Sequence, residues 1–357
     1  MNIPAQCKAT AVGSFPHSEV EDALQIIKEN IPQIPVWPQL PIYPEEGMTR
    51  QYNEGMPGLI TKGDRVFFDT SNSSFDSELM KFYEDYFQAL EMEDMPLEHP
   101  FGISPTYGRG FHALLRLLAE SDYTPVAIKG QITGPITLAT SLTDQNGKWA
   151  YYDNRLREVV IKTLALKVKW QIHQLRKFMT PVIIFIDEPS LAAYGSSAFL
   201  GISEDDVKND LTEIIEQIHS EGAIAGIHCC ENTDWGLLIS TDIDILNFDA
   251  YGFFDRLVLY ANLLQDFIKR GKVLAWGLIP TSDAEIISKE NPNSLIKRWK
   301  GYIQELARFG LEPEILIKQS LLTPSCGTGS LTPGLSEQVM KLLREVSEIL
   351  QNKYFAV

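Results

Sequence analysis

The sequence predicts an α/β protein that folds as one (β/α)8 TIM barrel. Apolar, β-branched runs alternate with amphipathic helical stretches along the whole chain, a pattern typical of parallel strands joined by crossover helices. There are eight such strand-then-helix units, the number that closes a barrel. An open, doubly wound sheet is the alternative, but no predicted strand is followed by the GxGxxG turn that binds phosphates in such sheets.

The predicted elements follow one another without a low-complexity segment or a short repeat, so we expect a single domain over residues 1–357. The strands are expected at 9–15, 34–40, 126–130, 181–187, 223–228, 243–248, 272–278 and 315–320. The helices are expected at 18–29, 77–92, 110–119, 154–179, 203–220, 254–270, 283–309 and 336–351, with a short one near Trp235. The prolines of the second strand should make it irregular.

A long excursion, residues 41–105, separates the second predicted strand from the third. It combines a turn-rich stretch, a polar stretch and an aromatic amphipathic helix. Connections of this length are more often functional than idle, so one expectation is a lid over the barrel mouth. The other is an accessory layer packed against the barrel.

The composition excludes several kinds of partner. The chain of 357 residues carries 31 Lys and Arg against 47 Asp and Glu, a formal net charge of −16. We therefore expect neither nucleic acid nor a membrane surface as a partner, since both are bound by clustered basic side chains. The N-terminus lacks the apolar run of a signal peptide and no apolar stretch is long enough to span a bilayer, so the expected location is cytoplasmic. Four cysteines in a reducing compartment would be thiols, available to a metal.

The segment 226–230, GIHCC, ends the fifth predicted strand with three side chains that can bind a metal. Neighbouring side chains on a strand point to opposite faces, so His228 and Cys230 share one side and Cys229 takes the other. An imidazole and a thiolate two residues apart can supply half of a zinc site. The plainer alternative is a hydrogen-bonded core histidine beside small buried cysteines.

Further ligands are expected at the same rim, because the carboxyl ends of barrel strands meet there. Asp249 follows the sixth strand, and Cys326 lies in a tight turn past the eighth. Two thiolates and an imidazole suit zinc or another thiophilic metal rather than magnesium or calcium. The alternative is that Asp249 caps the next helix and that Cys326 merely fits its turn.

Other polar groups at these strand ends are candidate substrate-binding residues. Val12, Gly13 and Ser14 form a turn after the first strand whose backbone N–H groups could hold a carboxylate. The remaining candidates, at the ends of the third and fourth strands, are Gln131, Thr133, Asp187 and Glu188.

Five motifs, VGSFP, KGQITGPITL, IDEPSL, IHCC and TPSCG, resemble those of the catalytic domain of the cobalamin-independent methionine synthase family. That family shares a superfamily with uroporphyrinogen decarboxylase, and the similarity runs over nearly the whole chain. The resemblance implies that zinc is the cofactor and that its ligands are His228, Cys230, Asp249 and Cys326, with Asp249 in place of the family's usual Glu. It also implies that the catalytic-site acid Asp187 holds the amino group of homocysteine and that the turn 12–14 contacts the same amino acid.

The folate half of the family's site is not retained. The chain has one barrel, the residues after GPIT lack the family's pterin-stacking Trp, and 276–281 lacks its His. We therefore expect a zinc-dependent methyltransferase that acts on a thiol such as homocysteine, with a donor other than folate. The leading donor is a methylcorrinoid, free or carried by a corrinoid protein, and a small methylated compound is the second option.

Two alternatives remain open at this point. One is a uroporphyrinogen decarboxylase-like enzyme, which would need basic side chains for many carboxylates. Only Arg50, Arg65 and Arg109 in the excursion are candidates for that role, and the Cys and His residues would be unexplained. The other alternative is a catalytically inactive relative that still binds the metal and a thiol.

Overall fold

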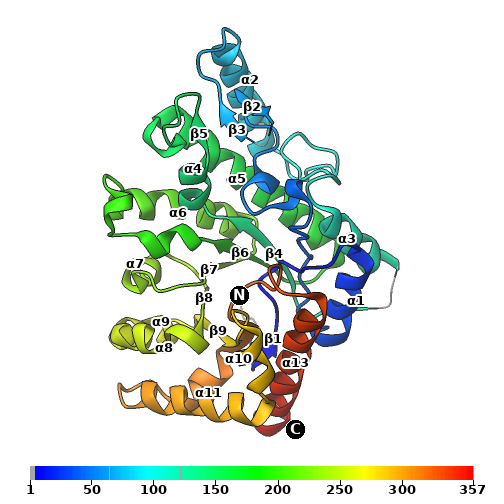
Figure 1. The fold of residues 1–357 in the computed structure, drawn as a ribbon, viewed down its shortest axis with the longest axis vertical. Coiled ribbons are helices and arrows are strands. Elements are labelled where there is room, and N and C mark those ends of the chain that lie inside the picture. Colours follow the sequence, from blue (N-terminus) through cyan, green and yellow to red (C-terminus); the bar gives the residue numbers. More distant parts are fainter. Residues whose placement is uncertain (1–4, 64, 121–122, 357) are drawn as a thin grey trace.

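The computed structural model of the chain describes residues 5–63, 65–120 and 123–356 (Figure 1). Its centre is a curled sheet of seven parallel strands in the order β1-β10-β9-β8-β7-β6-β4. The bounds are Lys8–Ala9 (β1), Ile128–Thr133 (β4), Val182–Asp187 (β6), Ile224–Cys229 (β7), Ile245–Phe248 (β8), Val273–Ile279 (β9) and Ser320–Pro324 (β10). These strands are buried on both faces because helices cover the outside of the sheet, which explains their near-continuous apolar runs.

The second predicted strand, 34–40, lies between β1 and β4 but forms no ladder. Val36 makes an isolated parallel bridge to Lys129 of β4, and Gln39 makes another to Ser14 beyond β1. Prolines at positions 35 and 38 remove backbone N–H donors from this segment, so a continuous ladder cannot form. The structure therefore shows a mixed α/β fold built on a curled seven-stranded parallel sheet, and the fully closed eight-stranded barrel stays a prediction.

The prediction of an eighth strand at 315–320 is wrong. Residues Pro313–Lys318 form the short helix α12, and the strand β10 begins only at Ser320. The β-branched Ile315 and Ile317 favoured a strand in the sequence, but Pro313 at the first helical position sets the backbone angle for a helix. The first predicted strand is also shorter than expected, since its ladder covers only Lys8–Ala9.

Helices surround the sheet largely where the sequence predicts them. They are α1 Val20–Asn30, α3 Arg109–Glu120, α5 Asn154–Leu175, α6 Glu204–Ser220, α7 Trp235–Ile239 and α13 Pro333–Phe355. The predicted helix 254–270 is divided into α8 Ala250–Leu257 and α9 Ala261–Lys269, and 283–309 into α10 Ala284–Lys289 and α11 Pro292–Ala307. The second break occurs at Pro292, where Asn291 forms a capping box for α11. The helix α4 Pro135–Ser141 was not predicted.

The part of the excursion that forms two strands and a helix, within 59–62 and 65–90, projects away from the sheet, at the top of Figure 1. Strands β2 Leu59–Lys62 and β3 Arg65–Phe68 pair antiparallel, and β5 Thr143–Asp144 joins β3 in parallel. The helix α2 Phe75–Leu90 follows them and packs on α5. Two buried lysines of α5 hold the end of α2 and the segment after it against α5. Lys169 donates to the Leu90 carbonyl, and Lys167 donates to the Gly102 carbonyl.

The near part of the excursion, 41–52, is held against the strand ends. The buried Glu46 carboxylate accepts hydrogen bonds from the Leu40 backbone N–H and from Arg109. Thr133 at the end of β4 donates to the Met48 carbonyl, and the Tyr52 hydroxyl donates to the Gln131 carbonyl. These contacts make 41–52 a packed wall beside the rim of the sheet. Within the described residues, no helix is long and apolar enough to cross a bilayer.

Candidate metal centre and adjoining cavity

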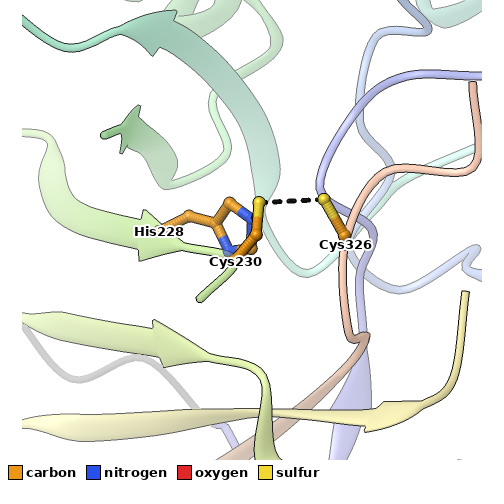
Figure 2. A group of neighbouring side chains, drawn as sticks. All are labelled: His228, Cys230 and Cys326. Atoms are coloured by element: carbon orange, nitrogen blue, oxygen red, sulfur yellow. Dashed lines mark hydrogen bonds between the residues drawn. The ribbon is translucent and has the colours of Figure 1, made fainter. Parts of the chain in front are cut away.

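Three of the four predicted metal ligands meet at the carboxyl ends of the strands (Figure 2). His228 Nε2 lies 3.0 Å from Cys230 Sγ, which confirms that these two side chains share one side of β7. Cys230 Sγ lies 2.9 Å from Cys326 Sγ in the turn after β10. The three possible ligand atoms all lie within 4.8 Å of one another.

The curl of the sheet brings the two cysteines together. Strands β8 and β9 separate β7 from β10, so the ends of β7 and β10 would lie about 14 Å apart in a flat sheet. The contact between the two sulfurs therefore depends on the curvature of the whole sheet. A cluster assembled from residues 96 positions apart is not produced by local sequence alone.

Asp249, the fourth predicted ligand, lies outside this group of described residues. Its side chain caps α8, where a carboxylate oxygen accepts a hydrogen bond of 2.8 Å from the Gly252 backbone N–H. Burial raises the pKa of Asp249 to about 6. The capping alternative is thus confirmed, and a ligand role for Asp249 stays a prediction.

The pKa values of Cys230 and Cys326 are shifted in opposite directions. The hydrogen bond from Cys230 and the nearby His228 lower the pKa of Cys326 well below its usual value, against the effect of burial. The same hydrogen bond, together with burial, raises the pKa of Cys230 well above its usual value. Burial disfavours a charged His228, but the Cys326 thiolate outweighs it and raises the pKa of the ring. One preformed thiolate beside a thiol and an imidazole is a donor set that a soft or borderline metal prefers.

Asn247 completes the surroundings of His228 and was not predicted. Its side-chain oxygen lies 2.6 Å from His228 Nδ1, and both residues are buried. The register of β7 and β8 pairs His228 directly with Asn247, so neighbouring strands present the two side chains at one level. The predicted strand 243–248 contains two polar residues, Asp244 near its start and Asn247 near its carboxyl end, and the position of Asn247 at that end was the available signal in the sequence.

A cavity of about 350 Å³ adjoins the three ligand atoms. Of the predicted substrate-binding residues, Val12, Ser14 and Asp187 line it. The lining residues are Val12, Ser14, Gln39, Pro41, Glu46, Met48, Asp187, Pro189, His228, Cys230, Cys326, Gly327, Gly329 and Ser330. The excursion residues Pro41, Glu46 and Met48 close one side of the cavity, so this accessory segment is part of the site.

Asp187 offers this cavity an unsatisfied acceptor. It ends β6 and is 7% exposed, and its Oδ1 atom has no hydrogen-bond partner among the residues that the structure describes. Burial raises the pKa of Asp187 to about 6, although His228 and Lys129 oppose the shift. A buried acceptor without a partner costs stability, and such groups are retained where a ligand completes them.

The turn 12–14 lies against the neighbouring strand ends. Gly13 has φ +152°, and a Cβ atom there would lie 2.6 Å from Gln39 Oε1 and 2.9 Å from Gln131 Nε2, so only glycine fits. The buried Lys129 ammonium donates to the Val12 carbonyl at 2.7 Å. Ser14 packs against Gly327 and Gly329 of the turn that carries Cys326.

The other four predicted substrate contacts, Gly13 of the turn 12–14 and Gln131, Thr133 and Glu188, are not among the residues that line the cavity. Gln131 donates to the Trp37 carbonyl, and Thr133 donates to the Met48 carbonyl. The Glu188 carboxylate accepts hydrogen bonds from the backbone of Ile136 and Thr137 at the start of α4. Burial raises the pKa of Glu188 to about 7. The geometry gives Gln131, Thr133 and Glu188 structural partners, and their contact with a substrate stays a prediction without support.

Gln39 is a cavity residue that the sequence reasoning missed. Its Nε2 donates to Gln51 Oε1 at 2.6 Å and to the Tyr52 hydroxyl at 3.0 Å, which uses both amide hydrogens. Gln39 lines the cavity, and its Oε1 lies next to Gly13 of the turn 12–14. Gln39 lies near the end of the second predicted strand, where substrate-binding residues are expected. Because that strand is irregular, its end could not be located from the sequence.

Comparison with known proteins does not assign the chain to a family. No protein-family model matches the chain, and no curated protein sequence matches it. Among solved structures, the chain is similar to a D-tagatose 3-epimerase-like protein with 14% identity and a TM-score of 0.39, over 71% of this chain and 89% of that one. It is also similar to dihydropteroate synthase from Xanthomonas albilineans with 10% identity and a TM-score of 0.27, over 71% and 87% of the two chains. The methionine synthase resemblance therefore depends on the five motifs.

Proposed function

We propose that this protein is a zinc-dependent methyltransferase that methylates the thiol of a small amino acid such as homocysteine. The observation that carries the proposal is the cluster of His228, Cys230 and Cys326 beside a cavity that also contains the unpartnered Asp187 oxygen. The three-residue cluster would bind a thiophilic ion, and the Asp187 oxygen in the adjoining cavity would accept a hydrogen bond from the amino group of the substrate. In the overall reaction the thiol loses its proton, its sulfur gains a methyl group, and the donor leaves in demethylated form.

The donor set fits zinc. In a tetrahedral site with Zn–S near 2.3 Å and Zn–N near 2.0 Å, neighbouring ligand atoms lie about 3.3 to 3.8 Å apart. The two short pairs here, at 2.9 and 3.0 Å, need to open by less than about 1 Å, which small side-chain rotations supply. Three protein ligands leave one position open, as catalytic zinc sites do. A bound zinc ion would deprotonate a coordinating substrate thiol while keeping its sulfur nucleophilic.

The chain's own residues would bind and orient the amino acid. Asp187 Oδ1 is the acceptor available to its ammonium group, and Gln39 lines the same cavity. The turn 12–14 borders the same cavity, where its backbone would contact the amino acid. Pro41 and Met48 supply apolar wall that excludes water from the reacting sulfur. Each group has a separate task, so each can be tested by a separate substitution.

The size of the cavity restricts the methyl donor. A volume of about 350 Å³ is near the lower end for ligand sites and suits one amino acid rather than an amino acid together with a folate. We propose that the donor approaches from the mouth of the cavity. A methylcorrinoid, free or on a partner protein, and a small methylated compound both meet this requirement.

A decarboxylase acting on a substrate with many carboxylates is less favoured. No Lys or Arg lies among the residues that line the cavity. Arg109 is occupied, since it pairs with Glu46 and lies 4.0 Å over the Tyr43 ring. The site would offer such a substrate too few positive charges.

The test combines metal analysis with a product assay. Purified wild type should contain one zinc per chain, and Cys230→Ser and Cys326→Ser should lose it, whereas the control Cys7→Ala, at a buried cysteine outside the cluster, should keep it. Homocysteine with methylcobalamin, and separately with methyltetrahydrofolate, is then assayed for methionine. Methionine from the folate alone would refute the donor assignment. Zinc binding without transfer from either donor or from a small methylated compound would indicate the inactive relative.

A further inference from the structure

The hydrogen bonds of Asn247 fix the orientation of its side-chain amide. Its Nδ2 donates to the Ala275 carbonyl and to Thr323 Oγ1, both at 2.8 Å. The opposite orientation would place the amide oxygen against the Ala275 carbonyl, where neither group can donate. The amide nitrogen therefore faces β9 and β10, and Oδ1 faces His228.

That orientation determines which nitrogen of His228 carries a proton. Asn247 Oδ1 can only accept, and it lies 2.6 Å from His228 Nδ1, so Nδ1 must be the donor. The neutral ring then has its lone pair on Nε2, the nitrogen that faces Cys230 Sγ at 3.0 Å. The atom that lies in the metal cluster is thus the one left free to bind.

We propose that Asn247 is a positioning residue of the metal centre: it holds His228 in the Nδ1–H form so that Nε2 binds the ion. The inference rests on the proposed function, since it assumes that the cluster takes up a metal. Asn247 is fully buried and lies outside the ligand group, so it acts only through His228.

The choice of an amide has an electrostatic reason. A carboxylate at this position would also accept from Nδ1, but it would add a fully buried negative charge beside two sulfurs and Asp187. An amide fixes the tautomer without that charge. Its two donor contacts, to strands β9 and β10, also explain why the acceptor cannot rotate away from the ring.

The test uses zinc affinity and the ring tautomer as separate measurements. Asn247→Leu keeps the approximate volume but removes the acceptor, and its zinc affinity, measured by competition with a chelator, should fall about 10- to 100-fold. Asn247→Asp restores an acceptor for Nδ1–H but places its second oxygen against the Ala275 carbonyl, so it should recover only part of the affinity lost in the leucine variant. Thr323→Val, the matched control, removes one partner of the amide nitrogen but keeps the contact with His228, and it should bind zinc within about threefold of wild type.

The tautomer is read by NMR of protein labelled with ¹⁵N in histidine. In zinc-loaded wild type, His228 should show a protonated Nδ1 and a metal-bound Nε2. Zinc bound through Nδ1, or an Asn247→Leu variant with unchanged affinity and tautomer, would overturn the proposal. If wild type takes up no zinc, the proposed function fails, and the neutral ring is read in the metal-free protein at high pH. An Nε2–H tautomer there would refute the role of Asn247 independently.

Discussion

Asp187→Asn should have opposite effects on folding and on binding. The wild-type carboxylate is buried with one unpartnered oxygen, and burial raises its pKa from 3.8 to about 6. Because the folded-state pKa is the higher one, this group's contribution to stability is complete below about pH 4 and is lost as the pH rises through about 6. The loss amounts to about 3 kcal/mol at a pH of about 8.

The asparagine variant does not have this titration. In the metal-free protein its free energy of unfolding should match wild type near pH 4 and exceed it by up to about 3 kcal/mol near pH 8. The substrate's ammonium group, in contrast, loses a charged hydrogen bond worth about 1.5 to 3 kcal/mol, which weakens homocysteine binding by about 10- to 150-fold. Such a gain in stability at the expense of binding is the behaviour of a ligand-binding group.

The assays are chemical denaturation of metal-free protein at the two pH values and calorimetric titration of zinc-loaded protein with homocysteine. The matched control is Glu188→Gln, the adjacent acid, whose oxygens are all used at the start of α4. It should destabilise the fold by about 1 to 3 kcal/mol, because a backbone donor loses its acceptor. A destabilised Asp187→Asn variant that binds homocysteine as tightly as wild type would refute the reasoning.

Three further predictions concern single residues. In the metal-free protein, the lowered pKa of Cys326 should make its rate of reaction with iodoacetamide rise much less than tenfold for each pH unit from about pH 6 to 8; a tenfold rise for each unit would contradict a preformed thiolate. Asp249→Ala should keep one zinc per chain while losing about 1 kcal/mol of stability from the cap of α8, and loss of the zinc would make Asp249 a ligand. Gly13→Ala should fold poorly or bind homocysteine weakly, because its Cβ would lie 2.6 Å from Gln39 Oε1; calorimetry that finds wild-type affinity would show that the turn can adjust.

Strand positions were predictable where a buried parallel strand is a continuous apolar run. The strands β6, β7, β8 and β9 lie within two residues of the predicted ranges. At 34–40 the prolines leave only isolated bridges, in agreement with the predicted irregularity, whereas the strand predicted at 315–320 is wrong because its β-branched residues occur in a short helix begun by Pro313. In both places a local backbone constraint outweighed the hydrophobic pattern.

The site was predictable to the extent that it follows from strand ends. His228, Cys230 and Cys326 come together because the carboxyl ends of a curled parallel sheet meet, which the alternation of strands and helices already implied. Asn247 and Gln39 were missed because their roles depend on strand register and on side-chain contacts between distant segments. Glu188 was assigned to the substrate because a sequence does not distinguish a polar side chain that faces a cavity from one that supports a helix.

The central claim is that three protein side chains bind one zinc ion and leave a place for a substrate sulfur. X-ray absorption at the zinc edge tests it most directly, on protein before and after homocysteine is added. The account predicts two sulfurs near about 2.3 Å and one histidine nitrogen near about 2.0 Å in the free protein, and a third sulfur after addition. A zinc ion without two sulfur ligands, or a sulfur count that homocysteine leaves unchanged, would contradict it.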